Sequence, residues 1–395
     1  MGASKAHVGS KQVKDYDRMT MTLFQRMWCG ALSLSLGLAW GQTPPDAPAT
    51  SSALTGEWLL EILLGELQVL QGDPGAGYSL LLDAALKSGD EGLYERAIDV
   101  ALRARAGEAA LRAASAWRQA APKSASANRR VLQIQLALQR LKEAQVSLRL
   151  SVQLAPEQER AAVMLALPSL LSRAGDKALA AQVLADALAP WGDDPAWGHL
   201  SWTAIGQARL QAGDAAGALQ AVQRAHRLSP SQPEPIWLAL DVAHSSPEAL
   251  AWLEGVMSPK SEPTLVLNWS KLLIQKGRLA QAEQVLLAHT QRPDAGPRPW
   301  LVLGALRQEM KNTAGAQEAW QRFLKEAASD PKLTRERDQA LMGLAQASLD
   351  AQLDAQAQLW LSQVSDPDNL LQARLMRATA LARKGQLEQG RQLIS

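Results

Sequence analysis

Residues 202–230 read WTAIGQARLQAGDAAGALQAVQRAHRLSP, and the spacing of their small and large side chains decides the fold. With Trp202 numbered as position 4, the informative positions are 4, 7, 8, 20, 27 and 32, occupied by Trp202, Ile205, Gly206, Ala218, Ala225 and Pro230. Small residues at positions 8, 20 and 27 let two helices approach closely, and large apolar residues fill the space between neighbouring pairs. Proline near position 32 ends the second helix, and glycine near position 15 closes the first. The stretch therefore predicts two packed helices joined by a short turn.

The same spacing recurs along the chain. A second clear copy places residues at positions 4, 7, 8, 20 and 24, and these are Trp300, Leu303, Gly304, Ala316 and Trp320. Together with weaker copies, these two give unit starts at residues 58, 91, 125, 161, 199, 263, 297, 338 and 371, with a shortened unit at 232–262. One such unit cannot bury its apolar face alone, so about ten units are expected to stack into an array.

This pattern resembles the tetratricopeptide repeat (TPR), a helix–turn–helix unit of about 34 residues. Arg209 at position 11 and Val222 at position 24 depart from its aromatic consensus. We expect an all-α TPR solenoid, a right-handed superhelix over residues 56–395, whose last repeat is cut within its second helix. Most tryptophans of the array are expected in the core, and Trp191 and Trp197 are the best candidates for partial exposure.

Two irregularities interrupt the repeats. Pro168 falls at position 8 of its first helix, where it should kink the helix or start a new one at residues 166–167. Residues 329–337 are charged and lengthen a loop. We interpret both as local geometry.

Composition excludes several classes of function. The chain has 395 residues, with 41 Lys and Arg against 39 Asp and Glu, so its net charge of +2 gives no electrostatic case for binding nucleic acid. Cys29 is the only cysteine, which excludes a disulfide framework and a thiolate metal site. Apolar residues make up 47% of the chain, enough for a packed core.

The first 55 residues look like an export region. Residues 19–41 predict a signal peptide: Arg26 supplies a positive charge, residues 29–38 form an apolar run, and cleavage is expected before Gln42. The run is too short to span a bilayer, and Cys29 precedes it rather than following it, which argues against lipidation. Residues 1–18 are expected to be a non-native extension, and residues 42–55 a linker rich in Pro, Ala, Ser and Thr. The predicted location is the periplasm.

No pattern of catalytic residues stands out. The chain carries no G-x-S-x-G, H-E-x-x-H or Walker motif. The histidines of the array, His199, His226, His244 and His289, lie far apart and have no metal ligand at helical spacing. We therefore predict no catalytic, cofactor or metal site, and no enzymatic activity.

The expected functional surface is the concave side lined by the first helix of each unit. In this frame positions 2, 5, 9 and 12 point inward. The candidate residues of this groove are Gln133, Gln207, Leu267, Lys271, Leu301, Met342 and Gln346. This mixture of polar and apolar side chains suits an extended peptide or a partner helix, although some of the apolar residues are alternatively expected to pack between units. The Lys and Asn pattern of a chaperone-binding carboxylate clamp is missing.

Residues 54–106 carry a more particular resemblance. A leucine-rich helix with L-x-x-E-L at 63–67 is followed by the segments YSLLLDAA and DEGLYERA. This arrangement resembles the start of the bacterial LbcA-type TPR adaptors, which bind a periplasmic carboxy-terminal processing protease and deliver murein hydrolases to it. The resemblance implies an exported scaffold with protein or peptide ligands, and it implies no individual binding residue here.

Three functions follow from the sequence. The first is a periplasmic scaffold that links a protease to cell-envelope substrates. The alternative is a TPR component of an envelope polysaccharide-export or secretion machine. An enzyme is the third and the least supported by the residues.

Overall fold

The computed structural model describes residues 56–258, 260–383 and 385–393, and all regular structure in these ranges is helical. The predicted signal peptide, linker and N-terminal extension lie outside the described residues. Two compact units divide the chain, residues 52–299 and residues 300–395, and each is described by itself. We call them the first unit and the second unit.

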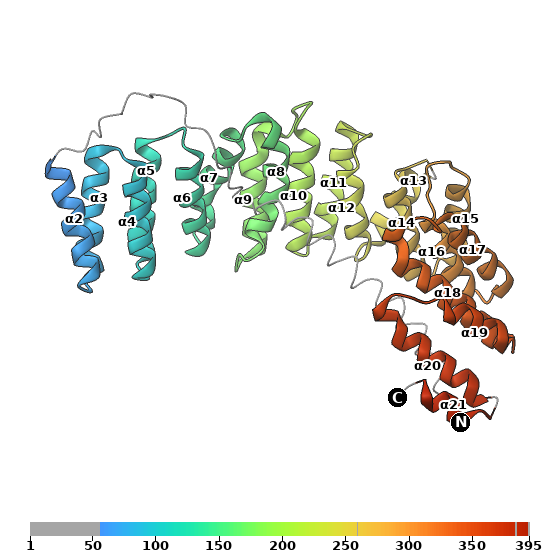
Figure 1. Cartoon of the computed structure of the whole chain (residues 1–395). Helices are drawn as coiled ribbons and strands as arrows, with labels where there is room; N and C mark the ends of the chain where they lie inside the picture. Colours follow the sequence, from blue (N-terminus) through green and yellow to red (C-terminus); the bar gives the residue numbers. More distant parts are fainter. Residues whose placement is uncertain (1–55, 259, 384, 394–395) are drawn as a thin grey trace, which may run out of the picture. The chain divides into compact units, whose positions relative to one another are not determined.

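The first unit is a row of antiparallel helix pairs. Its helices are α2 (Gly56–Leu70), α3 (Pro74–Ser88), α4 (Glu91–Arg103), α5 (Gly107–Ala120), α6 (Ala125–Ala137), α7 (Leu141–Gln153), α8 (Glu157–Leu171), α9 (Lys177–Leu188), α10 (Gly198–Gln211), α11 (Ala215–Leu228), α12 (Glu234–Ala243), α13 (Pro247–Val256), α14 (Pro263–Gln275) and α15 (Leu279–Thr290), with the short 3₁₀ helix η2 (Ala189–Trp191) after α9. Figure 1 shows α2 to α12 side by side, in chain order except that α9 lies next to α7 and α8 next to α10.

The second unit continues the same pattern. Its elements are α16 (Arg298–Glu309), which begins two residues before the division, α17 (Thr313–Glu326), η3 (Pro331–Leu333), α18 (Thr334–Asp350), α19 (Asp354–Ser362), α20 (Pro367–Arg383) and α21 (Leu387–Gln392). In α17–α20 each helix packs on the next, and α18 also packs on α20.

The helix pairs match the predicted repeats one for one. We call the first helix of each pair helix A and the second helix B. Helix A packs on its own helix B, as in α10 with α11. In α8, α10, α12 and α18 it also packs on the helix A of the next pair. The expected all-α solenoid of about ten helix–turn–helix units is therefore confirmed within the described residues.

Small residues bring the helices together where the sequence predicts. Gly206 of α10 lies so close to its neighbours that a Cβ there would stand 2.8 Å from Cδ2 of Leu238 and 3.2 Å from the Cβ of Ala221. Ala218 and Ala225 of α11 are fully buried. Three consecutive helices thus meet at one glycine, which explains why position 8 takes the smallest residue.

The turn between helices A and B has one recurring backbone conformation. In most units the residue at position 15 adopts positive φ, whether or not it is glycine: Gly72, Arg105, Gln139, Gly213, Gly277, Lys311, Gln352 and Gly385 have φ between 56° and 89°. Gly175, at this position of the unit that starts at residue 161, does not. The left-handed conformation ends helix A and turns the chain into helix B. It is costly for any residue with a Cβ.

We expect Arg105→Gly to raise the free energy of unfolding by about 0.5–1 kcal/mol, because glycine adopts the observed φ of 56° without strain. Gly213→Ala, at a φ of 81°, is expected to lower it by about 1 kcal/mol. Thermal unfolding of both variants measures the two shifts. Equal shifts of the same sign would contradict this account of the turn.

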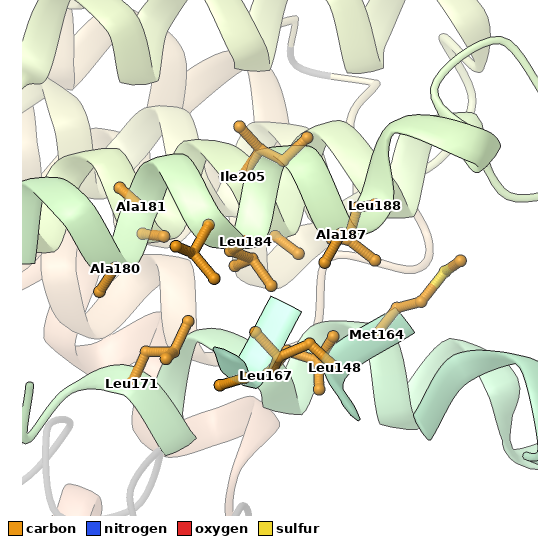
Figure 2. Close-up of a cluster of buried hydrophobic side chains, with 14 of the residues drawn as sticks. Leu148, Met164, Leu167, Leu171, Ala180, Ala181, Leu184, Ala187, Leu188 and Ile205 are labelled. Atoms are coloured by element: carbon orange, nitrogen blue, oxygen red, sulfur yellow. The ribbon is translucent and has the colours of Figure 1, made fainter. Parts of the chain in front are cut away.

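The core of the first unit runs between the layers of helices. Figure 2 shows one part of it, where Met164 and Leu167 of α8 lie against Leu148 of α7 and Leu184 of α9. All four side chains are 1% exposed or less. Burying each of them contributes about 1.5–3 kcal/mol, so the solenoid is stabilised locally, pair by pair.

Two predicted irregularities differ from the structure. Pro168 does not start a new helix: α8 runs from Glu157 to Leu171 as one helix, and Pro168 is buried three residues before its end. A proline there removes the backbone hydrogen bond to the carbonyl of Met164 without ending the helix. The charged segment 329–337 is partly helical rather than a loop, because η3 occupies Pro331–Leu333 and α18 begins at Thr334.

Candidate interaction surface

Positions 5 and 9 of helices A carry accessible side chains in the first unit, except for Thr203 of α10, which is buried, and we call these side chains the helix-A face. Residues four apart lie one above the other on a helix. The face comprises Glu95 and Asp99 of α4, Arg129 and Gln133 of α6, Leu165 and Ser169 of α8, Gln207 of α10, and Leu267 and Lys271 of α14. These side chains are exposed or half-buried. The packing of α8 on α10, α10 on α12 and α12 on α14 keeps neighbouring helices A in contact.

The chemistry of the face changes from one helix to the next. On α4 it is acidic and on α6 it is basic, and Arg130 of α6 reaches Glu95 of α4 across a 3.8 Å ion pair. On α8 it presents Leu165 beside the hydroxyl of Ser169, and α10 adds the amide of Gln207. Such a surface can hydrogen-bond an extended chain and bury apolar side chains of it at fixed intervals.

The structure distributes the predicted groove residues unevenly. Gln133 is exposed, and Gln207, Leu267 and Lys271 are half-buried on the helix-A face. In the second unit Gln346 is exposed and donates from Nε2 to Oδ1 of Asp350 at 2.9 Å.

Leu301 and Met342 of the second unit are buried. They are only 5% and 6% exposed, so they pack between helices, as the alternative reading of these positions expected. An apolar residue at position 5 is covered wherever the neighbouring helix approaches closely enough.

Tryptophan at position 4 of the repeat makes polar contacts that the sequence analysis did not predict. Trp202 donates from Nε1 to the carbonyl of Gly192 at 2.8 Å, and the guanidinium of Arg224 lies 4.7 Å from its ring centre. Arg224 also pairs with Asp193 at 2.6 Å.

The second strong repeat copies the arrangement, with Arg322 lying 4.8 Å over the ring of Trp300. In both repeats the arginine follows the tryptophan by the same number of residues, and this spacing was the available signal. A guanidinium over an indole stabilises the fold by about 0.5–1 kcal/mol. We therefore interpret the pair as a contact that supports the repeat.

Trp191 and Trp197 are half-buried, and both pack against the core of α8–α10. Arg160 lies 5.3 Å over the ring of Trp197. The carboxylate of Asp194 accepts the backbone N–H of Ala196 and of Trp197. The loop between α9 and α10 is therefore held by its own contacts.

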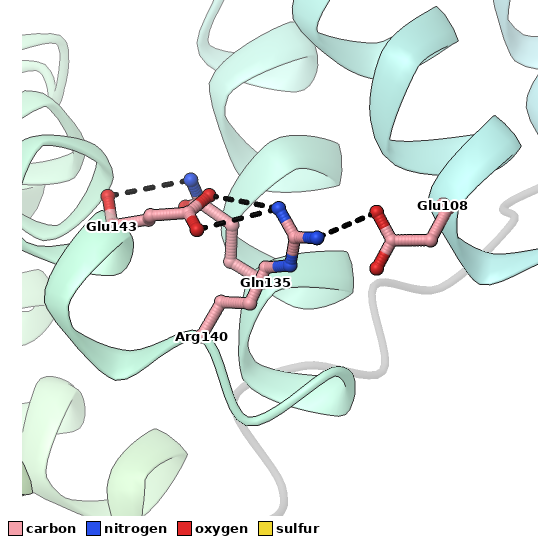
Figure 3. Close-up of polar contacts among 4 residues, drawn as sticks. All are labelled: Glu108, Gln135, Arg140 and Glu143. Atoms are coloured by element: carbon pink, nitrogen blue, oxygen red, sulfur yellow. Dashed lines mark hydrogen bonds and ion pairs between the residues drawn. The ribbon is translucent and has the colours of Figure 1, made fainter.

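Charged residues also join successive helices B. Figure 3 shows Arg140, just before α7, between Glu108 of α5 and Glu143 of α7. Its Nη2 lies 2.7 Å from Glu108 and its Nη1 lies 3.3 Å from Glu143. The hydrogen bonds with Glu143 and the attraction of both carboxylates raise the pKa of Arg140. Because the three side chains are partly exposed, these ion pairs contribute little to the free energy of folding. They connect one helix pair to the next.

His199, at the start of α10, is buried, and burial lowers the pKa of its imidazole, against a smaller attraction from Glu234. The unfolded chain then binds a proton more readily than the folded one, so stability is full above the unfolded pKa and is lost as the pH falls through it.

We expect the thermal unfolding midpoint of the first unit to fall between about pH 7 and pH 5. Burial also lowers the pKa of His226 in the same unit, so exchange of His199 for Gln removes one of two such groups and is expected to flatten the slope between the two pH values in part. Differential scanning calorimetry at both pH values compares the two chains. An unchanged slope in H199Q would assign the pH dependence to other groups.

Among the described residues, no three His, Cys, Asp or Glu side chains come together as metal ligands would. A hollow of about 720 Å³ lies between the loops around residues 230–233 and 257–262. His226 at its edge packs edge-on against Trp252, with ring centres 5.4 Å apart, and Glu262 accepts the hydroxyl of Thr264. These groups serve the local fold.

No family model and no curated protein matches the sequence. Among solved structures, the chain is similar to the TPR domain of P58(IPK), with 14% identity and a TM-score of 0.29 over 86% of this chain and 98% of that one. It is also similar to yeast Tom70, with 10% identity and a TM-score of 0.31 over 85% and 90%. The TPR-like solenoid itself rests on the packing of the chain's own repeats, given above.

In the described part of the chain, no helix has both the length and the apolar character needed to cross a bilayer.

Proposed function

We propose that the protein is a non-enzymatic scaffold that binds other proteins along the helix-A face of its first unit. The observation that carries the proposal is the repeated presentation of accessible polar and apolar side chains, such as Gln133, Leu165 and Gln207, by the first helices of successive repeats. A ligand laid across these helices meets one set of side chains per repeat. Binding of this kind needs about 1,000 Å² of buried surface in total, which a row of helices can supply.

The proposed location is the periplasm, and the proposed partners are a carboxy-terminal processing protease and its murein hydrolase substrates. The support is the predicted signal peptide at 19–41 and the resemblance of residues 54–106 to LbcA-type adaptors. Export is tested by mass spectrometry of the chain recovered from the periplasm. A mature N-terminus at Gln42 is expected, and peptides from residues 3–18 in the exported chain would contradict it.

Partner binding is tested by placing a photo-crosslinking amino acid at Gln133 or Gln207 in the native cell. We expect both positions to capture the same protein. Val146, which is exposed on the helix B α7, is the matched control and should capture nothing specific. Capture of a protease with murein hydrolases supports the adaptor role, whereas capture of polysaccharide-export components favours the alternative machine.

A charge-reversal pair separates the helix-A face from the surface at large. Arg129→Glu with Gln133→Glu changes the charge of α6 by the same amount as Lys142→Glu with Val146→Glu changes that of α7, and all four side chains are exposed. Only the first pair is expected to abolish co-purification of the partner. Equal loss in both pairs would show that net charge, and not this face, controls binding.

A further inference from the structure

The first described helix, α2, presents an uncovered stripe of leucines. Leu59, Leu60, Leu63, Leu64, Leu67 and Leu70 are all between 41% and 83% exposed. At 100° per residue they occupy an arc of about 140° on one side of the helix. The opposite side of α2 packs on α3 (Figure 1). This is the largest run of exposed apolar side chains on any described helix.

The internal repeats show how the positions of this stripe are covered elsewhere in the chain. Leu60, Leu64 and Leu67 occupy positions 3, 7 and 10 of helix A. In α6, α10 and α14 the same three positions are between 0% and 5% exposed, and they are held by Ala127, Val131, Ile134, Ser201, Ile205, Ala208, Leu265, Trp269 and Leu272. Position 3 faces the preceding helix B, because Ser201 donates its hydroxyl to the carbonyl of Leu188 in α9. Thus α2 carries the interface of an internal helix, and no helix of the described residues covers it.

Within residues 58–70, the part of α2 whose side chains the structure describes, no uncompensated charge flanks the stripe. Glu61 and Glu66 flank it, and each is already paired within the unit, Glu61 with Lys87 and Glu66 with Arg96, at 2.6 Å in both cases. Two hydrogen bonds from Arg96 hold the carboxylate of Glu66 and lower its pKa. These two carboxylates are therefore already neutralised within the unit, so they leave the stripe suited to an apolar helix.

The spacing of the leucines indicates which kind of helix would cover the stripe. Leu60, Leu63, Leu67 and Leu70 follow the alternation of three and four residues that forms the seam of a coiled coil. A seam of this kind is complementary to a copy of itself and packs knobs into holes about a two-fold axis. Residues 42–55, which would precede α2 if the signal peptide is removed as in the proposed function, contain no apolar run that could cover it.

We propose that the leucine stripe of α2 is the contact through which two copies of this chain associate as a symmetric dimer. The dimer pairs two scaffolds at their α2 ends and leaves the helix-A face of both first units free for partners. A single seam of four turns is a small interface, so the dimer is expected to form at micromolar concentrations and to dissociate on dilution.

The test is sedimentation velocity of the purified chain over a range of concentrations. The double variant Leu63→Glu with Leu67→Glu places four like charges in the seam of a dimer. It is expected to weaken association by at least about tenfold. The control is Leu170→Glu, an equally exposed leucine of α8 outside the stripe, which should leave association unchanged. Circular dichroism and thermal unfolding of all three chains show whether the fold is retained.

A chain that stays monomeric at tens of micromolar overturns the proposal, as does a dimer that survives L63E/L67E. A monomer in which the amides of α2 are strongly protected from hydrogen exchange assigns the stripe to another segment of the same chain, and it also overturns the dimer. Because purified protein is measured without partners, this result is independent of the crosslinking test of the proposed function.

Discussion

Replacement of Trp320 by Ala is expected to unfold the middle of the second unit locally. The indole is 5% exposed and lies between two glycines, Gly304 of α16 and Gly343 of α18. A Cβ on Gly343 would stand 2.7 Å from the ring, and one on Gly304 would also collide with it. Two helices A have therefore adapted their surfaces to this one side chain of α17. Removing it leaves a cavity that neither backbone can fill, at a cost of about 3–5 kcal/mol.

Hydrogen exchange measured by mass spectrometry localises the effect. Amides of α16, α17 and α18 are expected to lose protection in W320A, while those of α4–α9 keep it, because repeats contact only their neighbours. Leu359→Ala on α19 is the control, since that leucine is 59% exposed and its loss should be nearly neutral. Trp320→Phe should restore part of the protection. Uniform loss of protection over the whole chain would show that the repeats unfold as one cooperative block.

The helices of the solenoid were predictable because the repeat pattern is set by packing. Small residues at positions 8 and 20 and large ones at positions 4 and 7 can be read directly, and Gly206, Ala218, Gly304 and Ala316 are all buried where that pattern places them. The turn was less readable. Arg105 and Gln139 adopt the left-handed conformation that glycine usually marks, so composition alone hides these turns.

The structure explains why arginine replaces the usual aromatic residue at position 11. Arg209 occupies position 11, where an aromatic residue is usual, and its Nη1 donates to the carbonyl of Gly217 at 3.1 Å. Arg307 makes the same bond to Gly315 at 3.1 Å in the second strong repeat. The guanidinium thus ties helix A to the start of helix B by hydrogen bonding instead of by packing, and both residues of each pair recur at the same spacing.

The surface could be predicted only in outline. Helical periodicity gives the direction of positions 5 and 9, which placed Gln133 and Gln207 correctly on the accessible side of helix A. It does not give the distance to the neighbouring helix, and this distance buries Met342 while leaving Gln346 exposed one turn later. The leucine stripe of α2 was hidden for the same reason, since leucine at positions 3, 7 and 10 looks like ordinary core until the covering helix is found missing from the described residues.

Gly206→Val is expected to be the most damaging single substitution in the first unit. The new Cβ meets Leu238 of α12 at 2.8 Å, Ala221 of α11 at 3.2 Å and the carbonyl oxygen of Ala218 at 3.3 Å. The leucine can move, but the backbone of α11 cannot, so α10 must separate from α11, with the two further methyl groups of valine adding to the strain. Overpacking of a buried site costs about 1–3 kcal/mol, occasionally more, and valine is a poor helix former besides.

Gly255 of α13 supplies the matched control. No atom lies within 4 Å of the Cβ that a side chain would add there. Gly255→Ala is therefore expected to stabilise its helix by about 0.5–1 kcal/mol, through the lost flexibility of glycine. Thermal unfolding of G206V and G255A should give shifts of opposite sign, with the larger shift in G206V. If G206V unfolds like the unaltered chain, the close approach of α10, α11 and α12 at Gly206 is not what holds this repeat together, and the reason for glycine at position 8 must be sought elsewhere.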